Sequence, residues 1–393
     1  MQRTRTGRTT NGLLVGTRKG GFVLRRATDG SWSVVGGPIR LGTQVNDFQQ
    51  DPRRPEVWLH SAGGDFHLGP TIFRSTDAGR SWSEASRPPA FEPVTEEGAE
   101  PRHDGTSRGQ AVQRSFWFAP GHASEAGTWY VGTVPHGLFK SEDDGDTWSG
   151  VDGFNLNPLY RTWTGEPPGP PDGPFLHSVL VDPRDARHLF LSMSAGGTFE
   201  SHDAGASWTP INAGVKVEFL PDPYPEYGQD PHCVIQHPAD PDLLYQQNHC
   251  GIYRLDLREG RAWTRIGDHM PKEVGDIGFG IVGHPTRPDT VWVLPMDGTR
   301  VWPRTAPGGR LALYRTDDGG RSWRRQDAGL PQENAWFGSK RQALDVVGAP
   351  DAPDVVFGAT CGEVWVGHDG GERFECVARH LPEIYSVHAA VLA

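Results

Sequence analysis

The chain has 393 residues and a formal net charge of −11 at pH 7, with 36% hydrophobic and 22% charged residues. An acidic balance disfavours a general binder of nucleic acid or of anionic membranes, because both need a basic surface. No stretch approaches the roughly 18 apolar residues that a membrane-spanning helix requires. We therefore expect neither nucleic acid nor a membrane as a partner.

The first residues, "MQRTRTGRTTNG", are basic and lead into no apolar segment, so they do not resemble a secretory signal. We expect a disordered tail over residues 1–11, followed by a single domain over residues 12–393. Four cysteines without a CxxC pair favour reduced thiols and a cytoplasmic location. A chain from which an export signal had been removed would show the same pattern, so that alternative stays open.

Short apolar strands then follow in a recurring order along the chain. Residues 12–26, "GLLVGTRKGGFVLRR", predict two strands joined by a turn. From residue 46 onward an apolar strand ends in a signal such as "VDP" or "GHP", and a second apolar strand follows, such as "EVWLH" or "TVWVL". A Gly-containing loop and a third strand, such as "TIFRS" or "GLFKS", come next. We name these strands A, B and C, and the strand after the next turn D.

Each strand C leads into one repeated turn. Four close copies share the pattern [ST]-x-D-x-G-x-[ST]-W, at residues 75–82, 141–148, 201–208 and 316–323. Weaker copies lie at 28–32, 255–263 and 367–374. The Asp carboxylate can accept hydrogen bonds from backbone amides of the turn, and Gly supplies a positive φ angle. Calcium binding is the weaker alternative, because each turn offers too few oxygens.

These turns resemble the Asp-box, or BNR, repeat of sialidase-like β-propellers, whose relatives include sortilin-type receptors and photosystem assembly factors. Members of this superfamily are often described as glycosyl hydrolase-like or as WD40/YVTN/BNR-like repeat proteins. The resemblance implies an all-β propeller in which the Asp-box is structural, with the Trp packed between neighbouring blades. Seven copies predict seven blades, and six blades, as in true sialidases, is the alternative.

The C-terminal segment "YSVHAAVLA", residues 385–393, reads as a strand A with no strands after it. The N-terminal strands lack a strand A, so pairing of the two ends would complete one blade and close the ring. In this topology the starts of the A strands and the B–C loops meet at the channel mouth, opposite the repeated turns. The residues that we expect to bind a ligand there are Arg18, Asn46, His60, Arg114, Asn248 and Arg341.

Catalysis is harder to predict. True sialidases use three arginines and a Tyr–Glu pair, which we cannot assemble here, so sialidase activity is disfavoured. A generic glycosidase needs two carboxylates across a cleft. The catalytic candidates near the mouth are Asp47, Arg114, Asp297 and Glu363, and no motif ties any two of the carboxylates together.

Histidines suggest a metal instead. Several imidazoles that converge on one point can hold one divalent transition metal, as channel histidines do in some propeller polysaccharide lyases. The candidates are His136, His177, His232 and His249. The competing interpretation is that these rings only hydrogen-bond to neighbouring loops.

We therefore expect the protein to bind a carbohydrate-like or other polar small molecule at the channel mouth. Cleavage of that ligand, hydrolase-like or metal-dependent and lyase-like, is a further hypothesis that the sequence leaves open. A non-enzymatic scaffold or assembly factor that binds a protein partner is the alternative.

Overall fold

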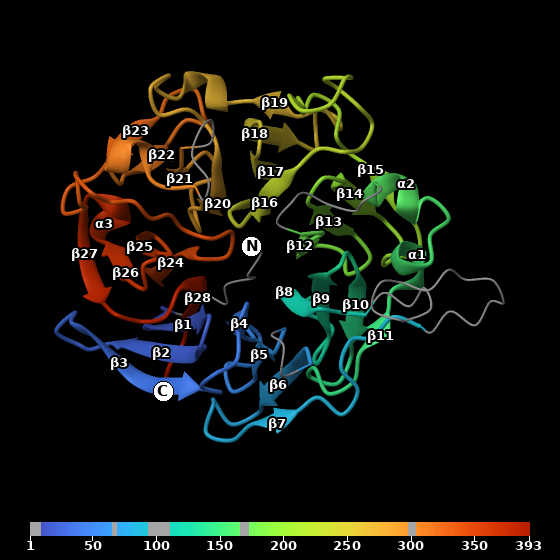
Figure 1. Ribbon diagram of the computed structural model, residues 1–393, viewed down its shortest axis with the longest axis horizontal. Helices are drawn as coiled ribbons and strands as arrows, with labels where there is room; N and C mark the ends of the chain where they lie inside the picture. Colours follow the sequence, from blue (N-terminus) through green and yellow to red (C-terminus); the bar gives the residue numbers. More distant parts are fainter. Residues whose placement is uncertain (1–8, 65–68, 93–110, 166–172, 298–303) are drawn as a thin grey trace.

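The protein folds into a ring of seven four-stranded antiparallel sheets (Figure 1). A computed structural model describes residues 9–64, 69–92, 111–165, 173–297 and 304–393. Each sheet holds one copy of the repeated turn, between its third and fourth strands. The seven-bladed propeller predicted from the repeat is therefore confirmed, and the six-bladed alternative is wrong.

The first three blades contain both ends of the described chain and the strands up to residue 150. Blade 1 consists of β28 (Ile384–Ala390), β1 (Gly12–Thr17), β2 (Gly20–Arg26) and β3 (Trp32–Ile39). Blade 2 consists of β4 (Phe48–Gln50), β5 (Trp58–Ala62), β6 (Thr71–Ser75) and β7 (Ser83–Glu84). Blade 3 consists of β8 (Arg114–Pro120), β9 (Trp129–Val134), β10 (Leu138–Ser141) and β11 (Ser149–Gly150).

The other four blades follow in chain order. Blade 4 has β12 (Leu176–Val181), β13 (Leu189–Met193), β14 (Gly197–Ser201) and β15 (Thr209–Pro210). Blade 5 has β16 (Pro231–His237), β17 (Asp240–Asn248), β18 (Gly251–Asp256) and β19 (Thr264–Arg265). Blade 6 has β20 (Gly278–Gly283), β21 (Val291–Pro295), β22 (Leu313–Thr316) and β23 (Arg324–Gln326). Blade 7 has β24 (Leu344–Ala349), β25 (Ala352–Gly358), β26 (Val364–Gly367) and β27 (Arg373–Ala378).

Helices are few and short in the described part of the chain. They are α1 (Asp152–Asn155), α2 (Tyr160–Thr164), α3 (His368–Gly371) and the 3-10 turns η1 (Gly267–His269) and η2 (Pro307–Gly309). Across the described ranges, no helix has the length and apolar character needed to cross a membrane.

The ring closes through the two ends of the chain. β28 pairs antiparallel with β1, with Leu14 opposite His388, and β1 pairs in turn with β2. This pairing confirms the predicted closure. Asn11 strengthens it, because its side chain donates to the Leu392 carbonyl at 3.0 Å and accepts from the Leu392 amide at 2.7 Å. Of the tail expected over residues 1–11, residues 1–8 lie outside the described residues, whereas Thr10 and Asn11 are hydrogen-bonded.

The core lies between the faces of neighbouring blades. β4, β8, β12, β16, β20, β24 and β28 surround the centre of the ring (Figure 1). Strands such as β13, "LFLSM", are buried along their whole length, because another blade covers each face. One apolar cluster contains side chains from blades 3 to 6, and another joins Leu14 of blade 1 to Phe48 and Trp58 of blade 2.

The repeated turn has the hydrogen bonds that its sequence predicts. In the copy at 141–148, the Thr147 amide and hydroxyl donate to the Asp143 carboxylate at 2.8 and 2.6 Å. Ser141 accepts from the Gly145 amide at 2.9 Å. The other three close copies repeat these contacts. One feature was not expected: the residue before the Gly is also left-handed, with φ 61° at Asp144.

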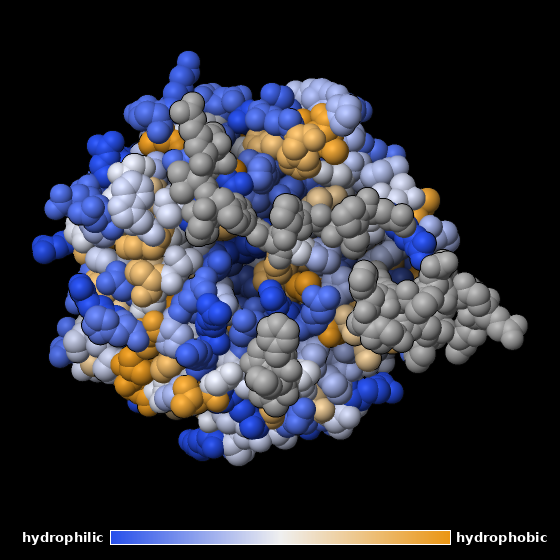
Figure 2. Space-filling model, viewed as in Figure 1, coloured by the Kyte–Doolittle hydropathy of each residue, from blue (hydrophilic) through white to orange (hydrophobic). Residues whose placement is uncertain are grey.

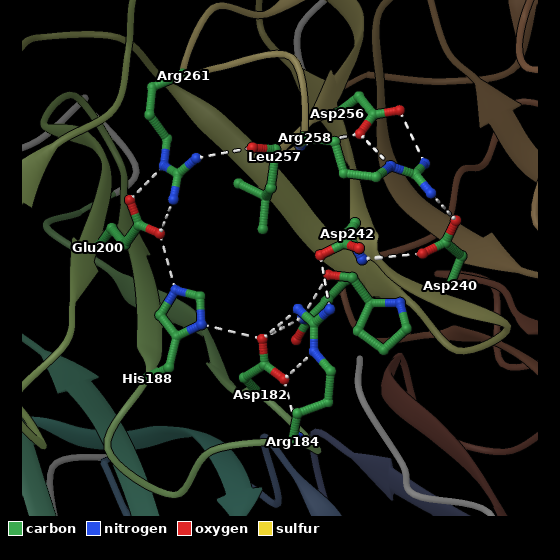
Figure 3. Close-up of polar contacts among 12 residues, drawn as sticks. Asp182, Arg184, His188, Glu200, Asp240, Asp242, Asp256, Leu257, Arg258 and Arg261 are labelled. Atoms are coloured by element: carbon green, nitrogen blue, oxygen red, sulfur yellow. Dashed lines mark hydrogen bonds and ion pairs between the residues drawn. The ribbon is translucent and has the colours of Figure 1, made fainter.

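A second polar network ties blade 4 to blade 5 near the ends of their strands (Figure 3). His188 lies between two carboxylates, with its Nδ1 2.9 Å from Asp182 and its Nε2 2.8 Å from Glu200. Glu200 also accepts from Arg261 of blade 5 at 2.6 Å. Burial disfavours the charged imidazole, but the hydrogen bonds to Asp182 and Glu200 outweigh it and raise the pKa of His188 to about 9.

The turn account predicts that Asp143→Ala lowers the free energy of unfolding by about 0.5–2 kcal/mol, the range for removing a side chain that caps backbone amides. Asp143→Asn should cost less, because its amide oxygen still accepts one of the hydrogen bonds. Urea unfolding followed by tryptophan fluorescence measures both variants. An Asp143→Ala protein as stable as wild type would contradict the account.

The His188 network predicts a pH-dependent stability. Because the pKa of His188 is raised from 6.5 to about 9, the folded state holds this proton more tightly than the unfolded state. Its stabilising contribution should be complete below pH 6.5 and should disappear as the pH rises through 9. Melting temperatures of wild type and His188→Gln between pH 6 and 9.5 test this. The difference in melting temperature between the two proteins should become smaller as the pH rises across that range. A constant difference would argue against a charged His188.

Candidate functional site

A cavity of about 390 Å³ lies at one end of the innermost strands. Its wall includes Asn46, two residues before β4, Arg114 at the start of β8, Phe279 in β20 and Gln342 just before β24. These positions come from four blades, so the cavity lies at a mouth of the central channel. The ring is hollowed at its centre in Figure 2, with hydrophilic and hydrophobic side chains side by side around the hollow.

The described lining of the cavity is strongly cationic. Four of its side chains carry positive charge: Arg114, Arg304, Lys340 and Arg341. Glu383 is the one carboxylate in that lining, and it already pairs with Lys340 at 3.1 Å. Within the described ranges, no residue forms a hydrogen bond or an ion pair with the Arg114 side chain. The cavity therefore presents an excess of positive charge to any ligand.

Aromatic rings form much of the remaining wall. Phe116 and Phe175 lie with their ring centroids 4.6 Å apart, and the Arg341 guanidinium lies 5.2 Å from the Phe175 ring and 4.8 Å from the Phe279 ring. Trp336 is 62% exposed although it belongs to the lining. Flat apolar faces and positive charge thus occur in the same cavity.

Three oxygen atoms of lining residues are buried without a hydrogen-bond partner among the described residues. They are Gln44 Oε1, Thr305 Oγ1 and Gln342 Oε1. The Gln342 amide nitrogen, by contrast, donates to the Phe116 carbonyl of blade 3 at 2.7 Å. A buried polar atom without a partner costs roughly 1–3 kcal/mol, so these three atoms destabilise the wall of the cavity as they stand.

The predicted ligand-binding residues divide into two groups. Asn46, Arg114 and Arg341 line the cavity, whereas Arg18, His60 and Asn248 do not. The Asn248 side chain closes a turn by donating to Gln246 and accepting from the Cys250 amide. Arg18 is exposed on the β1–β2 turn.

His60 lies in the core of blade 2 rather than at the mouth. It is fully buried, with its ring 5.4 Å from the Phe73 ring and 4.7 Å from the Trp82 ring. Burial lowers its pKa to about 4. The ring therefore packs as a neutral aromatic group.

None of the predicted catalytic carboxylates lines the cavity. Asp47 is fully buried, and it accepts from His388 at 2.6 Å and from the Phe118 amide at 2.7 Å, which joins blades 1, 2 and 3. Glu363 accepts from the Trp365 indole at 3.1 Å. Asp297 ends one of the described ranges and is also absent from the described lining. Arg114 is thus the one catalytic candidate that the structure places in the cavity.

Two of the four predicted metal-binding histidines hydrogen-bond to backbone carbonyls of neighbouring segments. His136 is fully buried and donates to the Ser194 carbonyl at 3.1 Å. His177 accepts from the Ser178 hydroxyl at 2.8 Å and donates to the Pro231 carbonyl at 2.9 Å. Burial lowers the pKa of both rings, to about 4 for His136. Both nitrogens of His177 are occupied, so this ring cannot serve as a ligand as it stands.

The other two histidines meet a carboxylate that the sequence interpretation missed. His232 and His249 lie together with Asp230, and the three candidate ligand atoms are within 4.8 Å of one another. Asp230 is two residues before His232, and residues two apart along a strand share a face. That spacing was the signal that could have identified Asp230.

Comparisons with known proteins support a propeller of glycosyl hydrolase-like fold. No family model matches the chain. The chain is 26% identical over 227 residues to the oligoxyloglucan-reducing end-specific xyloglucanase of Emericella nidulans. The matched region covers 50% of this chain and 25% of that protein. The chain resembles the GH74 xyloglucanase of Xanthomonas campestris, with a TM-score of 0.65, 16% identity and coverage of 95% and 53% of the two chains. It also resembles a GH74 enzyme of Niastella koreensis, with a TM-score of 0.57 and 15% identity. That match covers 99% of this chain and 59% of the enzyme.

The chain spans less than two thirds of the length of each of these three proteins. At 15–16% identity, the structural matches show the fold alone. They do not distinguish the sialidase-like Asp-box propellers from other propellers.

The placement of Asp47 predicts a structural role. Asp47→Ala would leave His388, the Phe118 amide and the Gln49 amide without their buried acceptor, and it should cost about 3–5 kcal/mol of unfolding free energy. Glu363→Gln is the control and should stay within about 0.5 kcal/mol of wild type. Urea unfolding measures both. An Asp47→Ala protein with wild-type stability would show that the hydrogen bonds of Asp47 to the three blades do not stabilise the folded protein.

Proposed function

We propose that this propeller binds an acidic, carbohydrate-like small molecule in the cavity at the channel mouth. The observation that carries the proposal is the lining itself, which combines the Arg114 guanidinium with aromatic rings and with polar side chains such as Asn46 and Thr360. Sugar hydroxyls both donate and accept hydrogen bonds, so they can pair with such side chains at several positions of one small ring. A purely apolar ligand would pair with none of them.

The acidic character of the ligand follows from the charges. A ligand carboxylate would offset the excess of positive charge, and Arg114 can bind it with two parallel N–H groups. Such charge-assisted pairs are about twice as strong as neutral hydrogen bonds. A neutral sugar would leave Arg114 without an anionic partner among the described residues.

The aromatic side chains suit the flat, carbon-rich face of a sugar ring. Trp336 packs over Gly309, where an added Cβ would come within 3.1 Å of the indole. The missing side chain at Gly309 therefore lets the indole approach the backbone closely beside the cavity. The volume of about 390 Å³ falls within the usual range for small-molecule sites, about 300–1,000 Å³.

Binding is favoured over cleavage at this cavity. Glycoside hydrolysis ordinarily uses two carboxylates that flank the scissile bond. The described lining offers Glu383 alone, already held by Lys340. The similarity to xyloglucanases therefore supports a carbohydrate as the ligand class, and their reaction remains a hypothesis for this chain.

A protein-binding role is the second candidate, and one observation favours it. The segment between β15 and β16 exposes Phe219, Leu220 and Tyr224, which are 49%, 38% and 60% exposed. Phe219 also lies 5.6 Å from the His249 ring, between ring centroids. We rank this role second, because single exposed apolar residues are common on monomeric proteins.

The proposal predicts that oligogalacturonate binds more tightly than a neutral xyloglucan oligosaccharide of similar length. Arg114→Gln should weaken oligogalacturonate binding by about 10–100-fold, the loss of one charge-assisted pair. Its effect on the neutral ligand should be small. Trp336→Ala should weaken both ligands. Isothermal titration calorimetry at low and high salt measures each affinity.

Arg258→Gln is the matched control, because Arg258 pairs with Asp256 within the repeated turn of blade 5 and is not part of the cavity lining. It should leave both affinities unchanged. The proposal would be wrong if neither oligosaccharide bound, or if Arg114→Gln and Arg258→Gln behaved alike. If no sugar bound, the protein-binding role would become the favoured function.

A further inference from the structure

We propose that Asp230, His232 and His249 form a binding site for one divalent transition-metal ion, with zinc as the best fit. The site is distinct from the cavity lining, and it stands or falls independently of the acidic ligand. Neutral imidazoles and a carboxylate are the side chains that zinc prefers after thiolates, and three of them leave the fourth position open.

Two neighbouring strands of blade 5 bring the three side chains together. Asp230 immediately precedes β16, His232 is its second residue, and His249 follows β17 in the turn to β18. The His249 amide donates to the Asp230 carbonyl at 2.9 Å, which holds the turn against the start of β16. Asp230 and His232 are buried, whereas the His249 side chain is 34% exposed.

The spacing of the ligand atoms matches a tetrahedral site. Asp230 Oδ2 lies 3.5 Å from His232 Nε2 and 3.4 Å from His249 Nδ1. These gaps are too long for good hydrogen bonds between the same groups. Zinc bonds of about 2.0–2.2 Å in tetrahedral geometry separate neighbouring ligand atoms by about 3.3–3.5 Å. The two measured distances therefore correspond to two edges of such a tetrahedron.

Hydrogen bonds outside the group orient two of the ligands. His232 Nδ1 donates to the Gly278 carbonyl at 2.6 Å, so in the neutral ring the lone pair is on Nε2 and faces Asp230. The Ala195 amide donates to Asp230 Oδ1 at 3.2 Å and leaves Oδ2 toward the histidines. Two electron-pair donors that face each other across 3.5 Å repel unless a cation lies between them. Outer partners of this kind are typical of metal-binding histidines.

The other group of potential ligands in the described residues does not suit a metal. It comprises His188, Glu200 and His202. Both nitrogens of His188 already form hydrogen bonds of 2.8–2.9 Å to carboxylates, and Glu200 is also held by Arg261. Figure 3 shows the contacts of His188, Glu200 and Arg261. Its short contacts are those of an ion-pair network.

The open coordination position would lie near the wall of the cavity. The His232 ring is 4.7 Å from the ring of Phe279, which lines the cavity, between centroids. Arg304, another lining residue, donates to His249 Nε2 at 3.5 Å. Metal binding at His249 Nδ1 would move the proton of that ring to Nε2, so Arg304 would have to turn away. Such an ion would add a Lewis acid beside the proposed ligand.

The test uses full-length protein treated with a chelator, dialysed, and titrated with Zn²⁺ or Co²⁺. Elemental analysis gives the stoichiometry, and visible absorption of Co²⁺ reports the tetrahedral geometry. We expect about one ion per chain. Asp230→Asn and His249→Ala should each weaken binding by at least about tenfold, because even outer partners of metal sites cost about 10–100-fold. Asp230→Asn keeps the acceptor for the Ala195 amide, and His249 is partly exposed, so both variants should fold.

His202→Ala is the matched control, since it removes a histidine from the other group and should bind metal like wild type. Melting curves without metal check that all variants are folded. The proposal is overturned if wild type binds no ion at 100-fold excess, if both ligand variants bind like wild type, or if His202→Ala removes the ion. The affinity for oligogalacturonate is measured in a separate titration without metal. Loss of metal binding then counts against the metal site alone, and absence of sugar binding counts against the proposed ligand alone.

Discussion

The pairing of β28 with β1 is the constraint on which the rest of the molecule depends. It makes one blade from the two ends of the chain, so every sheet has a neighbour on both sides and the ring cannot open at a seam. The buried contact between His388 of β28 and Asp47, next to β4, extends this closure into the following blade. Only a closed ring brings the starts of all seven innermost strands to one mouth.

Convergence at the mouth explains how the cavity is built. Gln342, just before β24, reaches the Phe116 carbonyl of blade 3, and Arg341 lies over the rings of Phe175 and Phe279. These residues are far apart in the sequence, and closure of the ring brings them within contact. A ligand in the cavity would therefore contact several blades at once. The proposed metal site of Asp230, His232 and His249 does not depend on ring closure in this way, because its residues come from two adjacent strands of one blade.

The fold could be predicted because its signals are local and repeated. Each copy of the turn carries its own hydrogen bonds, as at Asp143, and seven copies predict seven blades. The site could be predicted only in part. Asn46 and Arg114 were found because they lie at the starts of A strands. Asp47, the residue after Asn46, points instead into the contact between blades. The register also shifts at the starts of strands, as between His177 and Leu180, where Ser178 has φ 52°. Irregular backbone of this kind changes which way a side chain points and leaves no trace in the hydrophobic pattern.

Residues of long connections, such as Trp336 and Lys340, were missed because loops have no periodicity to follow. The central claim is that the cavity at the mouth holds an acidic sugar, and a crystal structure of the protein grown with oligogalacturonate tests it most directly. The account predicts a sugar carboxylate within hydrogen-bond distance of Arg114 and a ring face against Trp336. Sugar density elsewhere on the propeller, with the cavity filled by ordered water, would contradict it.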